Sequence, residues 1–526
     1  MHTAFSVEAP EGVAEADLGA IDALDAEADW SAREVSAVDL VGWLHAHSQA
    51  RRVVFRGGWV IAGEGDGPLD FADWRLDAAV VLRDCRVDSA LLFDHALLGR
   101  LEIDGCDLRG GLRLANTRMR GGLRIWRRTR IGSQDGISVE ASKATIDGHL
   151  EVGADTRLEG GLRLVGASVG GQLSIRGGAQ IAADPSGRSV AADRLAVSQN
   201  LFVQGTHTRL EGGLRLAGAS VGGQLAIADG AQIAADPSGW SVAADGLGVT
   251  GGLFVQGTDT RLEGGLRLAG ASVGGQLSIR GEAGVAKDVD LEAADVAILT
   301  VRSGHLGGVM DLSHAHLGRL DDDPRGWAQI TGGWRLAGIT IEALSGTLHG
   351  GGWTTKQRID WLERDETPSR RPFTQVADLY RRAGHREQAR KVSIAGEKAT
   401  SGWFRRLWAG TTVGYGYQPW RAAIAALALV VVAWIPVALL GDGIFAPDNP
   451  DTEMTCPEDF PCLNRALYLT EAVVPVVDFG QRDAWRLDPN GQHATTLQIG
   501  EYLLDGLGWI LALLLLGAVT GYIRQD

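Results

Sequence analysis

The sequence is poor in cysteine, proline and aromatic residues, and each shortage excludes a class of protein. Four cysteines in 526 residues are too few for a disulfide-stapled secreted scaffold. Proline occurs 15 times against 73 glycines, which excludes both a collagen-like chain and a Pro/Gly-rich disordered one. A net charge of −15 argues against a chain that coats nucleic acid, so no nucleic-acid partner is expected.

Residues 1–50 are acidic and lack the basic start and apolar core of a secretory signal. We therefore expect the body of the protein to be made and kept in the cytoplasm. Within this segment, Val38, Leu40, Val41 and Leu44 recur at roughly helical spacing. The spacing predicts an amphipathic helix that caps one end of the domain that follows.

From residue 51 to residue 352 the dominant pattern is Gly-Gly-x-Leu-x-Φ, where Φ is apolar. Leu101, Leu112 and Leu123 are 11 residues apart, and the residues that follow them, such as Glu102 and Arg113, are charged. This alternation is typical of short β-strands with one buried face. The glycines that bound each strand are expected to provide positive-φ corners.

A 52-residue duplication overlies this pattern between residue 153 and about residue 298. The string RLEGGLRL begins at Arg157, Arg209 and Arg261, and GASVGGQL follows each copy. Such a repeat predicts a mainly β fold, a β-helix or solenoid in which each coil contacts its neighbours. The Asp-Pro-Ser-Gly segments that follow Ala179 and Ala231 are expected to bulge from one edge as repeated loops.

Residues 353–410 change to a helical pattern. The stretch 373–402 predicts a helix, a turn at Gly384 and a second helix, which together form a helical hairpin. A basic segment follows the hairpin and would lie next to a membrane.

Two long uncharged runs lie in the C-terminal domain, residues 411–526. Residues 422–440 and 506–523 contain no charged side chain, and each run is close to the roughly 20 residues that span a bilayer core. Residues 375–421 carry nine Lys/Arg against three Asp/Glu, whereas the connector 441–505 carries twelve Asp/Glu against three Arg. The positive-inside tendency predicts a multi-pass protein of the cell membrane, with the solenoid and both termini cytoplasmic and the connector extracytoplasmic. The lipid bilayer is thus one expected partner.

The cysteine positions agree with this topology. Cys456 and Cys462 fall in the connector, where an oxidising compartment would allow a small disulfide loop, and two free thiols are the alternative. Cys85 and Cys106 fall in the solenoid and are expected to stay reduced.

The string TVGYG at Thr412–Gly416 matches the filter of potassium channels, but it precedes the first span instead of lying between two spans. We interpret it as a juxtamembrane turn. The side chains expected to anchor this turn at the membrane interface are Tyr415, Tyr417, Trp420 and Arg421.

An apolar stretch of the connector, residues 466–481, is too short to span and lies between the two runs. In placement and pattern it resembles the pore helix and filter of two-span cation channels. Asp478 stands where such a filter has glycine, and Pro475 interrupts the helix. The stretch is thus a pore-like loop or an interfacial helix that packs the two spans together. The pore-like segment would consist of Glu471, Pro475, Val477, Asp478, Phe479 and Gly480.

Common enzyme motifs give no candidate site. Walker A and H-E-x-x-H strings are absent, and G-x-S-x-G occurs only as part of the repeated GASVGGQL segments. His314 and His316 share a strand face at a spacing that metals can use, but exposed solenoid histidines are the simpler interpretation. We expect no catalytic residue, no cofactor and no metal site.

From about residue 33 to its end, the chain resembles a family of bacterial membrane proteins, common in actinobacteria and often labelled membrane-associated oxidoreductases. The resemblance rests on the Gly-Gly-x-Leu-x-Leu repeats, LYRRAGHREQARKV at Leu379, VGYGYQPWRA at Val413 and VVPVVDFGQRDAW at Val473. It implies a β-solenoid followed by a two-span membrane domain. The label implies a redox enzyme, although no flavin, nicotinamide, haem or paired-cysteine motif is present. Pentapeptide-type β-helices fused to two-span pore domains are a looser analogue.

Three hypotheses of function follow. The first is a non-enzymatic scaffold, a membrane-anchored solenoid that binds an unidentified protein partner through its ladder face or its loops. The second is a cation-channel-like protein gated by the solenoid, which requires several copies of the two-span unit and therefore a homo-oligomer. The third is the redox enzyme that the resemblance implies.

Overall fold

The computed structural model describes most of the chain in two separate compact units, residues 1–383 and 384–526. The described residues are 25–29, 34–36, 52–61, 68–133, 135–302, 304–345, 352–400, 420–440, 442–448, 462–474, 477–491 and 493–523.

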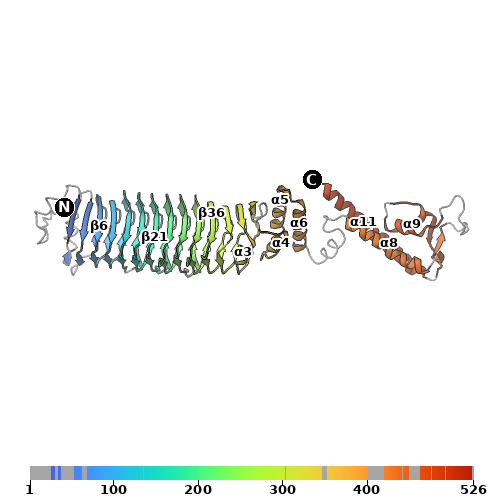
Figure 1. Cartoon of the computed structure of the whole chain (residues 1–526), viewed down its shortest axis with the longest axis horizontal. Coiled ribbons are helices and arrows are strands. Elements are labelled where there is room, and N and C mark those ends of the chain that lie inside the picture. Colours follow the sequence, from blue (N-terminus) through green and yellow to red (C-terminus); the bar gives the residue numbers. More distant parts are fainter. Residues whose placement is uncertain are drawn as a thin grey trace. The chain divides into compact units, whose positions relative to one another are not determined.

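The first unit is a parallel β-solenoid, as the repeats predict (Figure 1). Two sheets, here called B and C, contain 12 strands each, and sheet A contains 20. Sheet A runs from β1 (Asp25–Asp29) to β44 (Thr340–Leu344), sheet B from β2 (Glu34–Ser36) to β40 (His305–Leu306), and sheet C from β5 (Leu69–Asp70) to β43 (Trp334–Arg335). One coil is formed by β19 (Gly161–Arg163) in sheet C, β20 (Ser168–Val169) and β21 (Leu173–Arg176) in sheet A, and β22 (Gln180–Ile181) in sheet B.

Apolar ladders fill the interior, and the predicted alternation of buried and outward residues is confirmed. Leu101 of β9 (Leu97–Asp104) pairs with Leu123 of β13 (Leu123–Trp126), and Glu102 pairs with Arg124 beside them. Leu112 lies in sheet C, in β11 (Leu112–Arg113). The 11-residue spacing of the leucines is therefore half a coil. The same sequence motif forms strands in two different sheets, A and C.

The sequence duplication contains two coils of unequal length. Leu173, Leu201, Leu225, Leu253 and Leu277 are successive register partners, so a longer coil alternates with a shorter one. The longer coils, such as the one from Leu173 to Leu201, carry the Asp-Pro-Ser-Gly loops. One sequence repeat therefore corresponds to two coils, because a coil with the loop alternates with a coil without it.

Each coil turns from sheet C to sheet A through one left-handed residue. Three positions after each sheet C strand, φ lies between 55° and 70°. This corner is formed by Asp73, His95, Asn116, Lys143, Gly166, Arg194, Gly218, Gly246, Gly270, Ala293, His314 and Gly338. His314 is thus a corner residue outside the strand that begins at His316, so the expectation that these two histidines share a strand face is wrong.

The paired glycines of the RLEGG strings have a different role from the one predicted. Gly160 and Gly161 are outside the positive-φ region, so the expectation that they form sharp corners is wrong. A Cβ at Gly160 would lie 2.4 Å from the carbonyl oxygen of Gly136, and one at Gly161 would lie 2.9 Å from Cβ of Asp184. Glycine is required here by close approach of the neighbouring coils.

The repeated loops stack on one another along one edge. Pro185 is so close to Gly136, two coils earlier, that a Cβ on that glycine would lie 2.6 Å from the proline Cδ. Pro237 and Gly187 repeat the arrangement at 2.3 Å. Asp184 is buried and accepts bonds from the Ser186 and Arg188 backbone N–H groups at 2.8 and 3.1 Å. The loops are therefore packed turns that extend over the shorter coils.

A short helix, α3 (Pro324–Ala328), lies before the last strands of this unit, and α4 (Thr355–Glu363) and α5 (Arg370–Arg382) follow them. Arg358 of α4 is fully buried and donates to both carboxylate oxygens of Asp322, at 2.8 and 2.9 Å. The Trp327 indole donates to the same carboxylate at 2.7 Å, and the Trp353 ring lies 3.7 Å from the Arg358 guanidinium. In α5, the Gln375 side chain accepts from the Ile341 backbone N–H of β44 at 3.1 Å, which joins the helices to the last coil.

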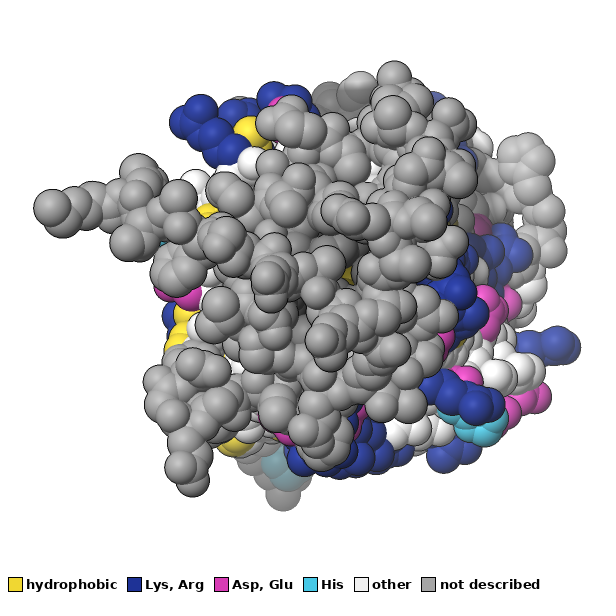
Figure 2. All heavy atoms as spheres, turned by 90° about the vertical axis from the view of Figure 1, so that its left-hand side faces the viewer, with side chains coloured by type: hydrophobic (Ala, Val, Ile, Leu, Met, Phe, Trp, Pro, Cys, Tyr) yellow, Lys and Arg dark blue, Asp and Glu magenta, His cyan; other side chains and the backbone are white. Residues whose placement is uncertain are grey.

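The N-terminal segment contributes strands to the first coil. β1 pairs with β3 (Arg52–Arg56) and β2 pairs with β4 (Trp59–Ile61), both in parallel. Residues 37–51, which include most of the predicted capping helix, lie outside the described part of the chain. Around the rim of this end, basic and acidic side chains lie close together (Figure 2).

The second unit contains five helices in its described part: α6 (Arg386–Thr400), α8 (Trp420–Leu440), α9 (Arg465–Val473), α10 (Gln481–Ala484) and α11 (Ala494–Ile523). An antiparallel strand pair, β45 (Phe445–Pro447) and β46 (Trp485–Leu487), brings an early and a later part of the connector together. The small core consists of Ala433, Val437, Phe445, Tyr468, Leu469, Ala484 and Trp485.

Helices form where both the hairpin and the membrane spans are predicted. α5 and α6 occupy the predicted hairpin helices, and Gly384 between them has φ of 84°. The spans predicted over 422–440 and 506–523 fall within α8 and α11 and stay a prediction. Measured on the described residues alone, no helix reaches the combined length and hydropathy of a membrane span.

Candidate functional site

The connector of the second unit is built around a buried carboxylate, Glu471 of α9. Asn464 caps α9, because its side chain accepts from the Ala466 and Leu467 backbone N–H groups at 3.1 and 3.3 Å. In its last turn, α9 places Glu471 where it accepts backbone N–H bonds from Phe479 and, at 2.9 Å, from Arg482. The carboxylate thus holds the loop after α9 against the helix.

The pore-like residues proposed from the sequence are only partly brought together. Asp478 is exposed and accepts from the Gly480 backbone N–H at 2.8 Å, so it closes a local turn. Val477 and Phe479 are also exposed. Pro475 lies outside the described residues. Of the two carboxylates in this segment, Glu471 is buried and Asp478 is exposed.

An ion-pair network connects the loop to α11. Arg482 donates two bonds of 2.8 Å to Asp505 and one of 3.3 Å to Glu501. The Tyr468 hydroxyl donates to Glu501 at 2.7 Å. Burial and the bond to Glu501 raise the pKa of Tyr468. Burial lowers the pKa of Arg482, but Asp505 and Glu501 more than offset this, so that pKa is raised.

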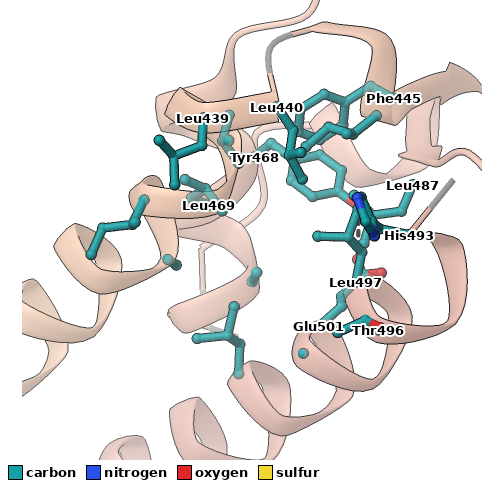
Figure 3. A pocket seen from close by; sticks show the side chains of 17 residues that line it. Leu439, Leu440, Phe445, Tyr468, Leu469, Leu487, His493, Thr496, Leu497 and Glu501 are labelled. Atoms are coloured by element: carbon teal, nitrogen blue, oxygen red, sulfur yellow. Dashed lines mark hydrogen bonds between the residues drawn. The ribbon is translucent and has the colours of Figure 1, made fainter. Parts of the chain in front are cut away.

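An apolar hollow of about 450 Å³ lies between α8, α9 and α11, beside this network. Figure 3 shows the labelled side chains around one space, with Phe445 and Leu440 towards one end and Thr496 and Glu501 towards the other. The hollow is lined by Ala433, Ile435, Val437, Leu439, Leu440, Ile444, Phe445, Tyr468, Leu469, Ala472, Leu487, His493, Thr496, Leu497, Gly500, Glu501 and Leu504. Its volume falls in the range of small-molecule sites, about 300–1,000 Å³.

The remaining predicted site residues lie outside the described residues or at the ends of described segments. Cys462 is disulfide-bonded, and Cys456 lies outside the described residues, so their pairing stays a prediction. Tyr415 and Tyr417 also lie outside, together with the TVGYG string. Trp420 and Arg421 begin α8, which places their backbone at the start of that helix.

An outward row of sheet A, here called the aromatic stripe, contains two phenylalanines, and the serines at its two ends are fully buried. Ser174, Phe202, Ala226, Phe254 and Ser278 are successive register partners in this row. Ala226 is only 6% exposed although it points outward, because it lies between the two phenylalanines. A Cβ at Gly252 would lie 2.4 Å from Cζ of Phe254, so that ring extends over the glycine of its own strand.

Two cysteines of the solenoid also lie close together. Cys85 and Cys106 are buried free thiols on adjacent coils, and the Cys85 backbone N–H points to the Cys106 sulfur at 3.4 Å. At the next coil Thr129 occupies the same corner and accepts from the Cys106 backbone N–H at 3.3 Å. The thiols are therefore corner residues of the solenoid.

Searching the described residues reveals no group of His, Cys, Asp or Glu arranged to hold a metal ion. Comparison of the chain with protein families, with curated proteins and with solved structures finds no match.

Proposed function

We propose that this protein is a non-enzymatic scaffold, in which α8 and α11 insert into a lipid bilayer and the β-solenoid presents a surface to a protein partner. The observation that carries the proposal is where the apolar side chains are exposed. Throughout the described residues, the exposed large apolar side chains all belong to residues 384–526. They are Ile424, Leu427, Val431, Val432, Trp434, Ile435, Leu439, Leu440, Val477, Phe479, Ile499, Tyr502, Leu503, Leu507, Trp509, Ile510, Leu513 and Leu516.

This distribution supports an anchor because water-exposed apolar surface of that extent is unfavourable. Leu427, Val431 and Leu439 of α8 are 65, 60 and 79% exposed. Each side chain moved from water into an apolar medium gains about 1.5–3 kcal/mol. Large apolar patches on a soluble monomer are uncommon and indicate a lipid or protein contact. The solenoid, in contrast, carries outward Arg–Asp and Arg–Glu pairs such as Arg215–Asp193.

The anchor is tested by membrane fractionation of the full-length chain. We expect it to stay in the membrane pellet after alkaline carbonate and to enter solution only in detergent. The double variant Leu427→Glu, Val431→Glu should shift into the soluble fraction, because charge inside a bilayer is expensive. Gln180→Glu, Gln232→Glu is the matched control on sheet B of the solenoid. Equal partition of both variants would contradict the anchor.

The scaffold role is supported by the stripe on sheet A. Half-buried aromatic side chains on a rigid, regular sheet resemble the anchor residues of protein interfaces. Arg280, which lies 5.0 Å from the Phe254 ring, borders the stripe with a positive charge. The outward row is charged at coils nearer the N-terminus, with Glu102, Arg124 and Glu151 in successive register.

The stripe is tested by replacing both aromatic residues with the residue that the adjacent coils already have. Phe202→Ser, Phe254→Ser should leave the solenoid folded, since Ser174 and Ser278 occupy the same ladder position. Cross-linking in native membranes should then lose the partner that wild type captures. Gln180→Ser, Gln232→Ser on sheet B serves as the control. A partner retained by the double serine variant would contradict this surface.

A further inference from the structure

The apolar hollow of the second unit has one charged end. Most of its walls are leucine, isoleucine, valine, alanine and phenylalanine side chains. The polar groups that reach it are Tyr468, His493, Thr496 and Glu501, and the last two lie together in Figure 3. Glu501 is the carboxylate among them, and its side chain is 19% exposed.

The charge on Glu501 is incompletely neutralised. Its nearest cation, Arg482, makes two bonds of 2.8 Å to Asp505 and only one, of 3.3 Å, to Glu501. One cation thus serves two carboxylates, which leaves the cluster with a net negative charge. Both the Arg482 and the Tyr468 bonds reach Oε1 of Glu501, so Oε2 can accept a further bond.

We propose that this hollow binds a single-chain cationic amphiphile, an alkylammonium whose chain lies along the apolar wall and whose head group pairs with Glu501. Burying the chain gains about 25 cal/mol per Å² of apolar surface. A partly desolvated carboxylate forms strong charge-assisted contacts with a cation, whereas an anionic head group would meet repulsion. The inference concerns the hollow itself and stands whether or not α8 and α11 enter a bilayer.

The hollow can be filled without disturbing the fold. Gly500 of α11 lines it, and a Cβ added at this glycine would meet nothing within 4 Å. Leucine also has a higher helix propensity than glycine. Gly500→Leu should therefore occupy the space of the alkyl chain and keep α11 intact.

Three probes with one chain length test the proposal: octylammonium, octanol and octanoate. The full-length chain is purified in a mild non-ionic detergent, and binding is measured by saturation-transfer difference NMR with competition. For wild type we expect the cation to bind at least tenfold more tightly than octanol and octanoate to bind most weakly. Gly500→Leu should weaken the binding of both the cation and octanol at least tenfold.

Glu501→Gln separates the charge from the cavity. It should abolish the preference for the cation and leave octanol binding unchanged. Asp483→Asn, which removes an exposed charge in α10 of the same unit, should change neither the preference for the cation nor the binding of octanol. The proposal is overturned if wild type binds octanoate as tightly as the cation, if Glu501→Gln keeps the preference, or if Asp483→Asn reduces it as much. Membrane fractionation of the same variants reports on the anchor separately.

Discussion

At the scale of single residues, the solenoid depends on one left-handed corner in every coil. Glycine adopts this conformation without cost, whereas an L-residue with a Cβ loses about 1–2 kcal/mol there. Asn, Asp and His tolerate it better than most, and they occupy several of these corners. At Ala293, with φ of 55°, the side chain offers no polar compensation.

We therefore expect Ala293→Gly to stabilise the protein by about 0.5–1 kcal/mol, the strain relief less the extra chain entropy of glycine. The measurement is the denaturation midpoint of the solenoid followed by far-UV circular dichroism. Ala217→Gly, one residue before the corner of another coil, is the control and should lower the midpoint. A lower midpoint for Ala293→Gly would show that strain at this corner is negligible.

A histidine on sheet A gives the solenoid a local pH dependence. His316 lies between two carboxylates, with Nδ1 3.0 Å from Asp295 and Nε2 3.1 Å from Glu342. The bond to Asp295, and then that to Glu342, raise the pKa of His316 above its ordinary value of 6.5. A raised pKa in the folded state means that the pair stabilises fully below pH 6.5 and that this contribution is lost as pH rises through the folded value.

We expect an NMR titration of the His316 ring to give a midpoint above 6.5 and stability to fall slightly over that window. The effect is small because the imidazole is nearly half exposed and solvent screens the pairs. His316→Gln should remove the dependence, and His305→Gln, an exposed histidine of sheet B, should not. A His316 midpoint that is not raised would contradict the bonding geometry.

At the scale of elements, the sequence predicts strands, the repeat and the helices because these depend on local periodicity. The alternation of Leu101 and Glu102 is readable since a strand has period two. The length of a coil could not be predicted from this spacing, because Leu112 repeats the motif in a strand of a different sheet. The role of Gly160 could not be predicted either, since its neighbour Gly136 approaches only after the coils stack.

The coil pairs predict which deletions the solenoid tolerates. Removing residues 201–224, one whole coil of the shorter kind, brings Leu225 to the position of Leu201 and restores the leucine ladder of sheet A. It also brings two loop-bearing coils together, so it should leave a folded but less stable protein. Removing residues 157–208, one complete sequence repeat, should also leave a folded, shorter protein, since stability in such arrays is a sum over neighbours.

Removing residues 157–182, half of the sequence repeat, should fail because this deletion shifts the inward ladders out of register. Soluble expression and far-UV circular dichroism of the three variants provide the measurement. Equal loss of folded protein in all three would contradict the alternation of longer and shorter coils.

At the scale of the whole molecule, the candidate site depends on residues distant in sequence. Arg482 meets Asp505 and Glu501 only because the loop after α9 folds back towards α11. The sequence placed Glu471 and Gly480 in the predicted pore-like stretch, whose role stays a prediction. It could not indicate which carboxylate is buried, because the burial of Glu471 and the exposure of Asp478 depend on how the loop after α9 folds against the helix.

Charge asymmetry predicts the orientation of the proposed anchor. Residues 375–421, which precede the apolar run 422–440, carry nine Lys/Arg against three acids, and the connector 441–505 carries twelve acids against three Arg. Positive flanks are retained on the cytoplasmic side. A reporter pair active on opposite sides of the membrane should therefore place residue 450 outside the cytoplasm and residues 350 and 526 inside.

The basic flank also supplies the variant that tests the cause. Replacing Arg381, Arg382, Arg405 and Arg406 by Gln and adding four lysines after residue 448 should move part of the population to the inverted orientation. Exchanging the same four arginines for lysine keeps the charge and should change nothing. If an impermeant reagent labels residue 450 of wild type only after lysis, the orientation is wrong. If residues 450 and 350 are both labelled only after lysis and the chain is absent from the membrane pellet, the apolar faces of α8 and α11 must instead contact a protein.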